Sequence, residues 1–110
     1  MAQKSITKLD ADIVASIARY RAILEHLHIP VEQMIVFGSH AKGTAHPQSD
    51  IDLAVISPAF GRDDVEEMQM LWKKTHLADV RIEPFPLSPH DLAHDSSPII
   101  GEIRKYGVTI

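Results

Sequence analysis

The sequence predicts an α/β (α+β) domain in which a small mixed sheet of three or four strands is flanked by helices. Two observations support this fold class. Residues 34–37 and 51–56 are apolar runs of strand length, and residues 10–27 and 63–74 place apolar side chains at helical spacing. The expected order of elements is α-β-α-β-α-β-α. A chain of 110 residues suffices for one domain, which we expect to span 1–110.

The first predicted helix begins near Asp10 or Asp12, either of which can cap it, and ends near Leu27, before Pro30. Its apolar residues recur every three or four positions, which places them on one face. They are Ile13, Val14, Ile17, Tyr20, Leu24 and Leu27. We therefore expect this face to lie against the core.

The helix predicted at residues 63–74 is indicated by its charges as well as its apolar residues. Acidic side chains crowd its first turn and lysines its last turn, which suits the helix dipole. The charged residues are Asp63, Asp64, Glu66 and Glu67 at the start and Lys73 and Lys74 at the end. Val65, Met68, Leu71 and Trp72 are expected to form its buried stripe.

Residues 79–86 predict a third strand. Its two prolines cannot donate ladder hydrogen bonds, so we expect this strand at an edge of the sheet. Ser-Pro pairs at 88–89 and 97–98 predict the starts of two short helices. The apolar residues 108–110 are expected to be extended, against either a neighbouring strand or a partner.

The chemistry of the chain is concentrated in residues 34–56. Asp50 and Asp52 open the second apolar run, and strand side chains alternate, so both project from one face, roughly 6 to 7 Å apart. Carboxylates this close repel each other, and a divalent cation between them relieves the repulsion. Because oxygen ligands favour hard cations, we expect Mg²⁺.

Gly38 and Ser39, after the first strand, predict a phosphate-binding turn. Glycine allows a sharp turn and the close approach of a ligand, and Ser39 is expected to cap a helical turn whose N–H groups face an anion. Gly43 permits a second bend. For this turn and the two aspartates to meet one triphosphate, the two strands have to be antiparallel neighbours.

The segment GSHAKGTAHPQSDIDLAV, residues 38–55, resembles the signature of the DNA polymerase β-like nucleotidyltransferases. The short chain resembles their minimal nucleotidyltransferase (MNT) branch, which includes antitoxins. The branch often has arginines after the Gly-Ser pair, where this chain has histidine and lysine. The resemblance implies the nucleotidyltransferase fold and the binding of ATP or another nucleoside triphosphate. The nucleotide-binding residues that it implies are Gly38, Ser39, Lys42, Gly43 and Ser49.

The same resemblance implies a catalytic site with two Mg²⁺ ions on Asp50, Asp52 and a third carboxylate. Glu83 is the favoured third carboxylate, and Asp79 is the alternative, because both are expected on one face of the third strand. An ion pair with Arg81 or a nearby lysine is the purely structural interpretation of Glu83.

Composition excludes several other classes. The chain has no cysteine, which excludes disulfides and thiolate metal sites. Residues 1–10 lack the apolar core of a signal peptide, and no apolar run is long enough to span a membrane, so we expect a cytoplasmic protein without a membrane partner. The formal charge is −4 without a basic tract, which argues against nucleic acid as a partner.

The resemblance implies an enzyme that transfers a nucleoside monophosphate, AMP from ATP, to an acceptor hydroxyl. The chain leaves no room for an acceptor domain, so the acceptor is expected in a groove, at a subunit interface of an oligomer, or on a partner protein. A small helical HEPN-type partner is the favoured acceptor. A small-molecule acceptor is one alternative. The other is a non-catalytic antitoxin or binding module that neutralises a partner by contact, with the apolar C-terminal segment in the interface.

Overall fold

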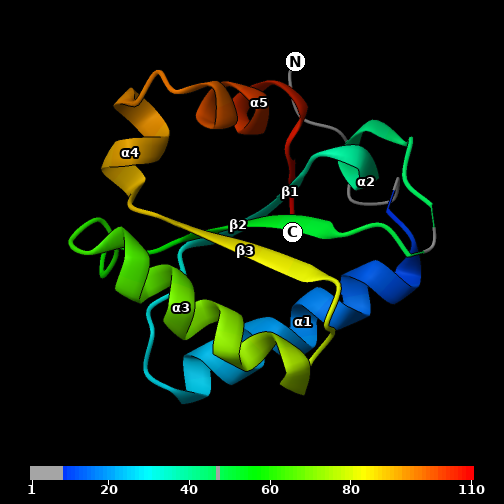
Figure 1. The fold of residues 1–110 in the computed structure, drawn as a ribbon, viewed down its shortest axis with the longest axis horizontal. Helices are drawn as coiled ribbons and strands as arrows, with labels where there is room; N and C mark the ends of the chain where they lie inside the picture. Colours follow the sequence, from blue (N-terminus) through cyan, green and yellow to red (C-terminus); the bar gives the residue numbers. More distant parts are fainter. Residues whose placement is uncertain (1–8, 47) are drawn as a thin grey trace.

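The computed structural model describes residues 9–46 and 48–110, whose fold is drawn in Figure 1. The elements in chain order are α1 (Ala11–His26), β1 (Gln33–Phe37), α2 (Ser39–Lys42), β2 (Ile51–Ile56), α3 (Asp64–Lys74), the 3-10 helix η2 (Thr75–Leu77), β3 (Ile82–Leu87), α4 (Pro89–His94), α5 (Pro98–Tyr106) and β4 (Val108–Thr109). The predicted mixed α/β class is confirmed. Two helices follow β3 and begin at the predicted Ser-Pro pairs at 88–89 and 97–98, and a short fourth strand lies in the segment expected to be extended. The expected order is therefore extended by one helix and one strand.

The strands form one mixed sheet in the order β3-β2-β1-β4. β1 is antiparallel to β2, as predicted, with Phe37 opposite Asp52. β2 and β3 are parallel, with Asp52 opposite Glu83, and α3 makes the crossover between them. β3 is an edge strand, which confirms the expectation drawn from Pro84 and Pro86.

Apolar side chains cover both faces of the sheet. Alternate residues of β1 point to opposite sides, so Met34 and Val36 belong to a core with α1, whereas Ile35 and Phe37 belong to a second core with α5. In Figure 1, α1 and α3 accordingly lie on one side of the sheet, and α4 and α5 lie on the other.

The prediction for α1 is confirmed within a residue at its C-terminal end. Ile13, Ile17, Tyr20 and Leu24 are almost fully buried, whereas Leu27 is 41% exposed, so its predicted burial is wrong. Leu27 is the C-cap, beyond the last turn that packs on the sheet. α1 has 16 residues, and in residues 9–46 and 48–110 no helix is long and apolar enough to cross a membrane.

The predicted buried stripe of α3 is partly wrong. Leu71 is fully buried, but Trp72 is 51% exposed and Val65 is 67% exposed. Consecutive residues of an α-helix are rotated by about 100°, so the orientation that turns Leu71 towards the sheet turns Trp72 away from it. The buried face continues from Leu71 to Thr75, four residues later. The end of α3 is also connected to α1, because the Tyr20 hydroxyl donates a hydrogen bond of 2.7 Å to the Leu71 carbonyl.

The C-terminal segment pairs within the chain. β4 lies antiparallel to β1, and the Ile110 N–H donates to the Met34 carbonyl at 2.9 Å. Val108 is fully buried. Of the two expectations for residues 108–110, the neighbouring strand is therefore confirmed.

Candidate active site

The structure brings the predicted site residues together where β1 ends and where β2 and β3 begin. Gly38 follows the last residue of β1 and lies beside the start of β2, because these strands are antiparallel. Its φ is 73°, and an added Cβ would collide with the Asp52 carboxylate. Only glycine fits this turn without displacing the carboxylate.

Three predicted carboxylates share this end of the sheet. Asp52 and Glu83 are paired positions on adjacent strands, and Asp50 directly precedes β2, so that its charge acts on both of them. Ala54 and Phe85, two residues further along each strand, belong to the core on the α5 side. Because side chains alternate along a strand, Asp52 and Glu83 also project towards the α5 side of the sheet.

The carboxylates of this cluster destabilise one another's charged forms. Burial raises the pKa of the Asp52 carboxyl, and the negative charges of Asp50 and Glu102 raise it further. His40 acts on it in the opposite direction. Burial also raises the pKa of Glu83, with the charges of Asp52 and Asp50 as further causes. The site therefore has an excess of negative charge.

This donor set fits a hard divalent cation. Within residues 9–46 and 48–110, no group of three His, Cys, Asp or Glu side chains is already arranged around a metal position. The carboxylates of Asp50, Asp52 and Glu83 nevertheless offer the oxygen ligands that Mg²⁺ requires, and a cation between them would offset the repulsion that raises the pKa of Asp52 and Glu83. Their role as metal ligands stays a prediction.

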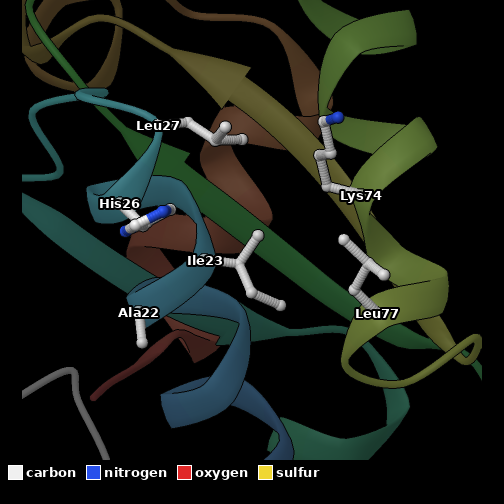
Figure 2. Close-up of a pocket in the computed structure, with 6 residues that line it drawn as sticks. All are labelled: Ala22, Ile23, His26, Leu27, Lys74 and Leu77. Carbon is white, nitrogen blue, oxygen red and sulfur yellow. The ribbon is translucent and has the colours of Figure 1, made fainter.

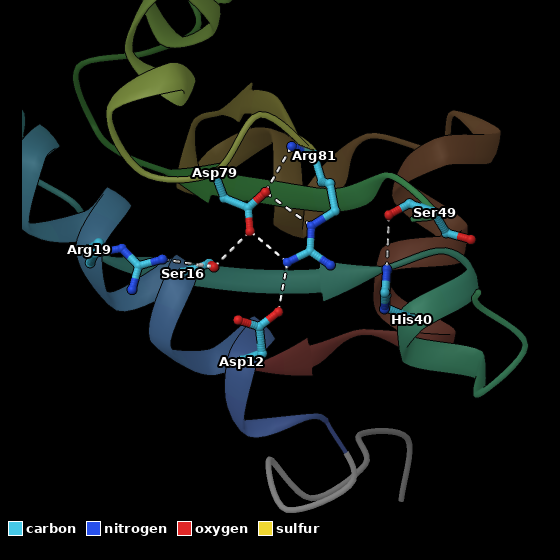
Figure 3. Close-up of polar contacts among 7 residues, drawn as sticks. All are labelled: Asp12, Ser16, Arg19, His40, Ser49, Asp79 and Arg81. Carbon is cyan, nitrogen blue, oxygen red and sulfur yellow. Dashed lines mark hydrogen bonds and ion pairs between the residues drawn. The ribbon is translucent and has the colours of Figure 1, made fainter. Parts of the chain in front are cut away.

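Asp79, the alternative third carboxylate, is engaged elsewhere (Figure 3). The Arg81 side chain donates hydrogen bonds of 2.7 and 3.0 Å to it, and the Ser16 hydroxyl donates one of 2.7 Å. The hydrogen bonds from Arg81 hold the pKa of the Asp79 carboxyl well below its usual range. Asp79 also precedes β3 and is not part of it, so the strand predicted at 79–86 starts three residues too early.

The phosphate turn differs in one detail from its prediction. Gly38 is the N-cap of α2 and Ser39 its first residue, so the expectation that Ser39 caps the helix is wrong. The first N–H groups of a helix have no intrahelical partners, which leaves them available to an anion beside Gly38. Gly43 ends α2 in the left-handed conformation, with φ of 79°.

Ser49 shapes the loop before β2. Its hydroxyl accepts a hydrogen bond of 2.8 Å from the His46 N–H, and its own N–H donates to the His46 carbonyl at 3.0 Å. His40 Nε2 lies 3.1 Å from the Ser49 carbonyl oxygen, as Figure 3 shows. These contacts connect the loop to α2 directly before Asp50. A direct contact between Ser49 and nucleotide stays a prediction.

Lys42 points towards α5. Its Nζ lies 3.5 Å from a Glu102 carboxylate oxygen and 4.8 Å from the centroid of the Tyr106 ring. Sequence reasoning did not single out Glu102 or Tyr106 for the site. They lie far from residues 38–55 in the chain, and no local pattern there marks them.

An apolar pocket of about 340 Å³ lies between α1 and the end of α3 (Figure 2). Its lining residues are Ala22, Ile23, His26, Leu27, Lys74 and Leu77. Leu77, at 57% exposure, is among the most exposed large apolar side chains. No carboxylate lines this pocket, so it lacks the groups that would hold a metal-bound triphosphate.

Comparisons with known proteins agree with this geometry. The sequence profile of the nucleotidyltransferase domain family matches residues 17–96. No curated protein matches the sequence. A crystal structure of a toxin–antitoxin complex with AMP-PNP has 25% sequence identity and a TM-score of 0.56, over 82% of this chain and 68% of that chain.

Two further solved structures share the fold. A candidate nucleotidyltransferase from Sulfolobus solfataricus has 16% identity and a TM-score of 0.51, over 91% of this chain and 86% of that chain. A mutant of the toxin–antitoxin MntA–HpeT has 22% identity and a TM-score of 0.52, over 82% and 70%. The family profile covers most of the chain, including the turn and all three strand ends of the site. The chain therefore belongs to the nucleotidyltransferase domain family and is a nucleotidyltransferase.

Proposed function

We propose that this enzyme transfers AMP from ATP, in a Mg²⁺-dependent reaction, to a hydroxyl group on a partner protein. The observation that carries the proposal is the cluster of Asp50, Asp52 and Glu83 beside the Gly38 turn. Similarity to a toxin–antitoxin complex that contains AMP-PNP supports an adenine nucleotide as the donor.

In this proposal, Asp50, Asp52 and Glu83 would hold two Mg²⁺ ions. Bound Mg²⁺ supplies positive charge that stabilises the triphosphate and the charge that develops during transfer. Gly38 lets the backbone approach the phosphates, and the first N–H groups of α2 donate hydrogen bonds to them. Lys42 adds a positive charge at the same turn. The chain contributes mainly by positioning and electrostatics.

The transfer itself is a substitution at phosphorus. The acceptor hydroxyl oxygen forms a bond to the α-phosphorus, and the bond from that phosphorus to the bridging oxygen breaks. Pyrophosphate leaves with the electron pair. The hydroxyl proton passes to the Glu83 carboxylate, which lies on the strand beside Asp52.

Exposed apolar side chains support a protein acceptor. The pocket between α1 and α3 has Leu27 and Leu77 exposed, with Lys74 and His26 on its lining. Such a surface suits a partner segment that presents apolar side chains flanked by carboxylates, because the carboxylates would pair with the lysine. A small helical HEPN-type protein is the proposed partner. Leu77→Ser should weaken its binding without changing the affinity for nucleotide.

The deciding experiment follows the label from α-labelled ATP. The purified protein is incubated with Mg²⁺ and an extract of its own cells, beside the Asp50→Asn/Asp52→Asn double variant. Label on one protein band with the wild type alone supports the proposal and identifies the acceptor for mass spectrometry. Label in the small-molecule fraction would replace the protein acceptor by a small molecule.

The same experiment addresses the non-catalytic alternative. If no fraction gains label while the wild type and the double variant retain the same partner on a column, a binding module replaces the transfer reaction. If the variant loses the partner, the carboxylates contribute to the interface itself, and the variant cannot be used to separate binding from chemistry. Leu77→Ser then provides the separate probe of binding.

A further inference from the structure

The Lys42 ammonium is held by two side chains of α5. It forms an ion pair of 3.5 Å with Glu102 and lies 4.8 Å from the centroid of the Tyr106 ring. The Lys42 and Glu102 side chains are each 37% exposed. An ion pair as exposed as this one contributes little to folding stability, so a stabilising role does not explain it.

The position of this pair relates it to the site. Helical side chains tilt towards the helix N-terminus, so Lys42, the last residue of α2, reaches back towards the Gly38 end. Glu102 is close enough to Asp52 for its charge to raise the pKa of that carboxyl. Lys42 also belongs to the turn itself, because its N–H donates a hydrogen bond of 3.1 Å to the Gly38 carbonyl. The ion pair of Lys42 with Glu102 therefore connects α5 to the phosphate turn.

A glutamate at this position is unfavourable by itself. It adds a fourth negative charge to a cluster whose charged forms already destabilise one another, and a negative charge near the phosphate turn would also repel a triphosphate bound there. Its negative charge is paired with the Lys42 ammonium. A flexible lysine that is ordered before the ligand arrives loses less rotamer freedom on binding, and this effect offsets the unfavourable charge of Glu102.

We propose that Glu102 is a positioning residue which, together with the Tyr106 ring, holds the Lys42 ammonium where it contacts the triphosphate of the bound nucleotide. The inference rests on the proposed function, because it assumes that a triphosphate occupies the Gly38 turn. Glu102 acts through Lys42 and makes no contact with the nucleotide.

The test is a double-mutant cycle read as binding affinity. The affinity of the full chain for AMP-PNP in the presence of Mg²⁺ is measured by calorimetry for the wild type, Glu102→Gln, Lys42→Met and the double variant. We expect Glu102→Gln to weaken binding about fivefold and Lys42→Met about tenfold. Because Glu102 acts through Lys42, the double variant should bind no more weakly than Lys42→Met alone.

Lys105→Met is the matched control. Lys105 lies over the same Tyr106 ring, at 5.3 Å from its centroid, and forms no ion pair with Glu102 among the described residues. Its removal should leave the affinity unchanged. A loss of affinity equal to that of Lys42→Met would show a general effect of positive charge and would overturn the proposal.

The remaining outcomes separate this inference from the proposed function. If Glu102→Gln binds AMP-PNP as tightly as the wild type or more tightly, Glu102 does not position Lys42 and the inference fails. It also fails if the effects of the two single variants add, because Glu102 would then act on the carboxylates and not on Lys42. If the wild type does not bind AMP-PNP with Mg²⁺, the proposed function fails, and this inference fails with it.

Discussion

Two carboxylate clusters lie at the same end of the sheet and differ in how their charge is balanced. In one cluster, Asp79 accepts hydrogen bonds from Arg81 and Ser16, and its pKa is lowered. In the other, Asp52 and Glu83 have raised pKa values. The clusters are adjacent, since the Ile51 N–H donates to the Arg81 carbonyl at 2.8 Å.

The difference distinguishes a structural carboxylate from a candidate ligand. The Asp79 cluster joins α1 to the start of β3, because Arg81 also pairs with Asp12 at 2.9 Å. The negative charge of Asp79 is already paired with the Arg81 guanidinium. The Asp52 cluster retains charge that a cation would stabilise, so we place the metal there. Each prediction below tests whether the two clusters behave in these opposite ways.

The largest expected effect is on activity. Asp50→Asn/Asp52→Asn should lower the rate of nucleotide transfer by at least about 1,000-fold, or ~4 kcal/mol, because the variant loses the charges that bind the cation. Thermal unfolding should show no loss of stability, since removing repelling charges relieves strain in the cluster. An unfolded variant, or one that keeps most of the activity, would contradict the assignment.

The next effect concerns the turn that contacts the cluster. Gly38→Ala should destabilise the fold by about 2 to 4 kcal/mol and weaken nucleotide binding, because the added Cβ collides with Asp52 and because the backbone, with φ of 73° and ψ of −151°, is in a region that essentially only glycine adopts. Gly43→Ala is the matched control, since its φ is also positive, at 79°, but nothing lies within 4 Å of its Cβ position. It should cost only about 1 kcal/mol in urea unfolding. Equal losses for both variants would show that the Asp52 contact is unimportant.

Changes in the Asp79 cluster should affect the stability of the fold and not the transfer reaction. Asp79→Asn should destabilise the fold by about 1.5 to 3 kcal/mol, because it weakens hydrogen bonds between charged groups, and leave the transfer rate per folded molecule unchanged. Asp12→Asn should have a smaller effect, since the Asp12 side chain is 73% exposed. A loss of catalysis in folded Asp79→Asn would instead favour Asp79 as the third carboxylate.

The two clusters should also respond to pH with opposite sign. The lowered pKa of Asp79 adds stability that is complete above the ordinary aspartate pKa of about 4 and is lost as pH falls through the lowered value. The pKa values of Asp52 and Glu83 are raised in the folded protein, so ionising these groups is less favourable in the folded than in the unfolded state. The folded state therefore loses stability as the pH rises from about 4, the ordinary carboxyl pKa, through the raised values. Urea unfolding from about pH 2 to 8 should show the second slope become smaller in Asp50→Asn/Asp52→Asn, where the burial of Glu83 remains, and the first slope disappear in Asp79→Asn.

The smallest expected effect is the response to metal alone. Mg²⁺ should raise the melting temperature of the wild type by a few degrees at neutral pH and by less at pH 4, where protons compete for the carboxylates. Asp79→Asn should keep this shift, whereas Asp50→Asn/Asp52→Asn should lose it. The reverse pattern would place the cation at the Asp79 cluster.

Much of the fold could be predicted because local patterns specify it. The spacing of Ile13, Ile17 and Leu24 predicts α1 and its buried face. The chemistry of the Gly38 turn and of Asp50 and Asp52 predicts the antiparallel pairing of β1 and β2. In contrast, the burial of α3 residues could not be predicted, because Leu71 and Trp72 are equally apolar neighbours and only the packing against β3 decides which faces inward.

The sequence by itself determined the family, the position of the Gly38 turn and the pair of aspartates that opens β2, because these depend on residues close together in the chain. The tertiary structure decided how distant charges are balanced. It pairs Arg81 with Asp79 and Asp12, sets Glu83 beside Asp52, and brings Glu102 to Lys42. The physical reason is that the pKa of a carboxyl depends on burial and on every charge within a few ångströms, and distances between remote residues exist only in the folded chain.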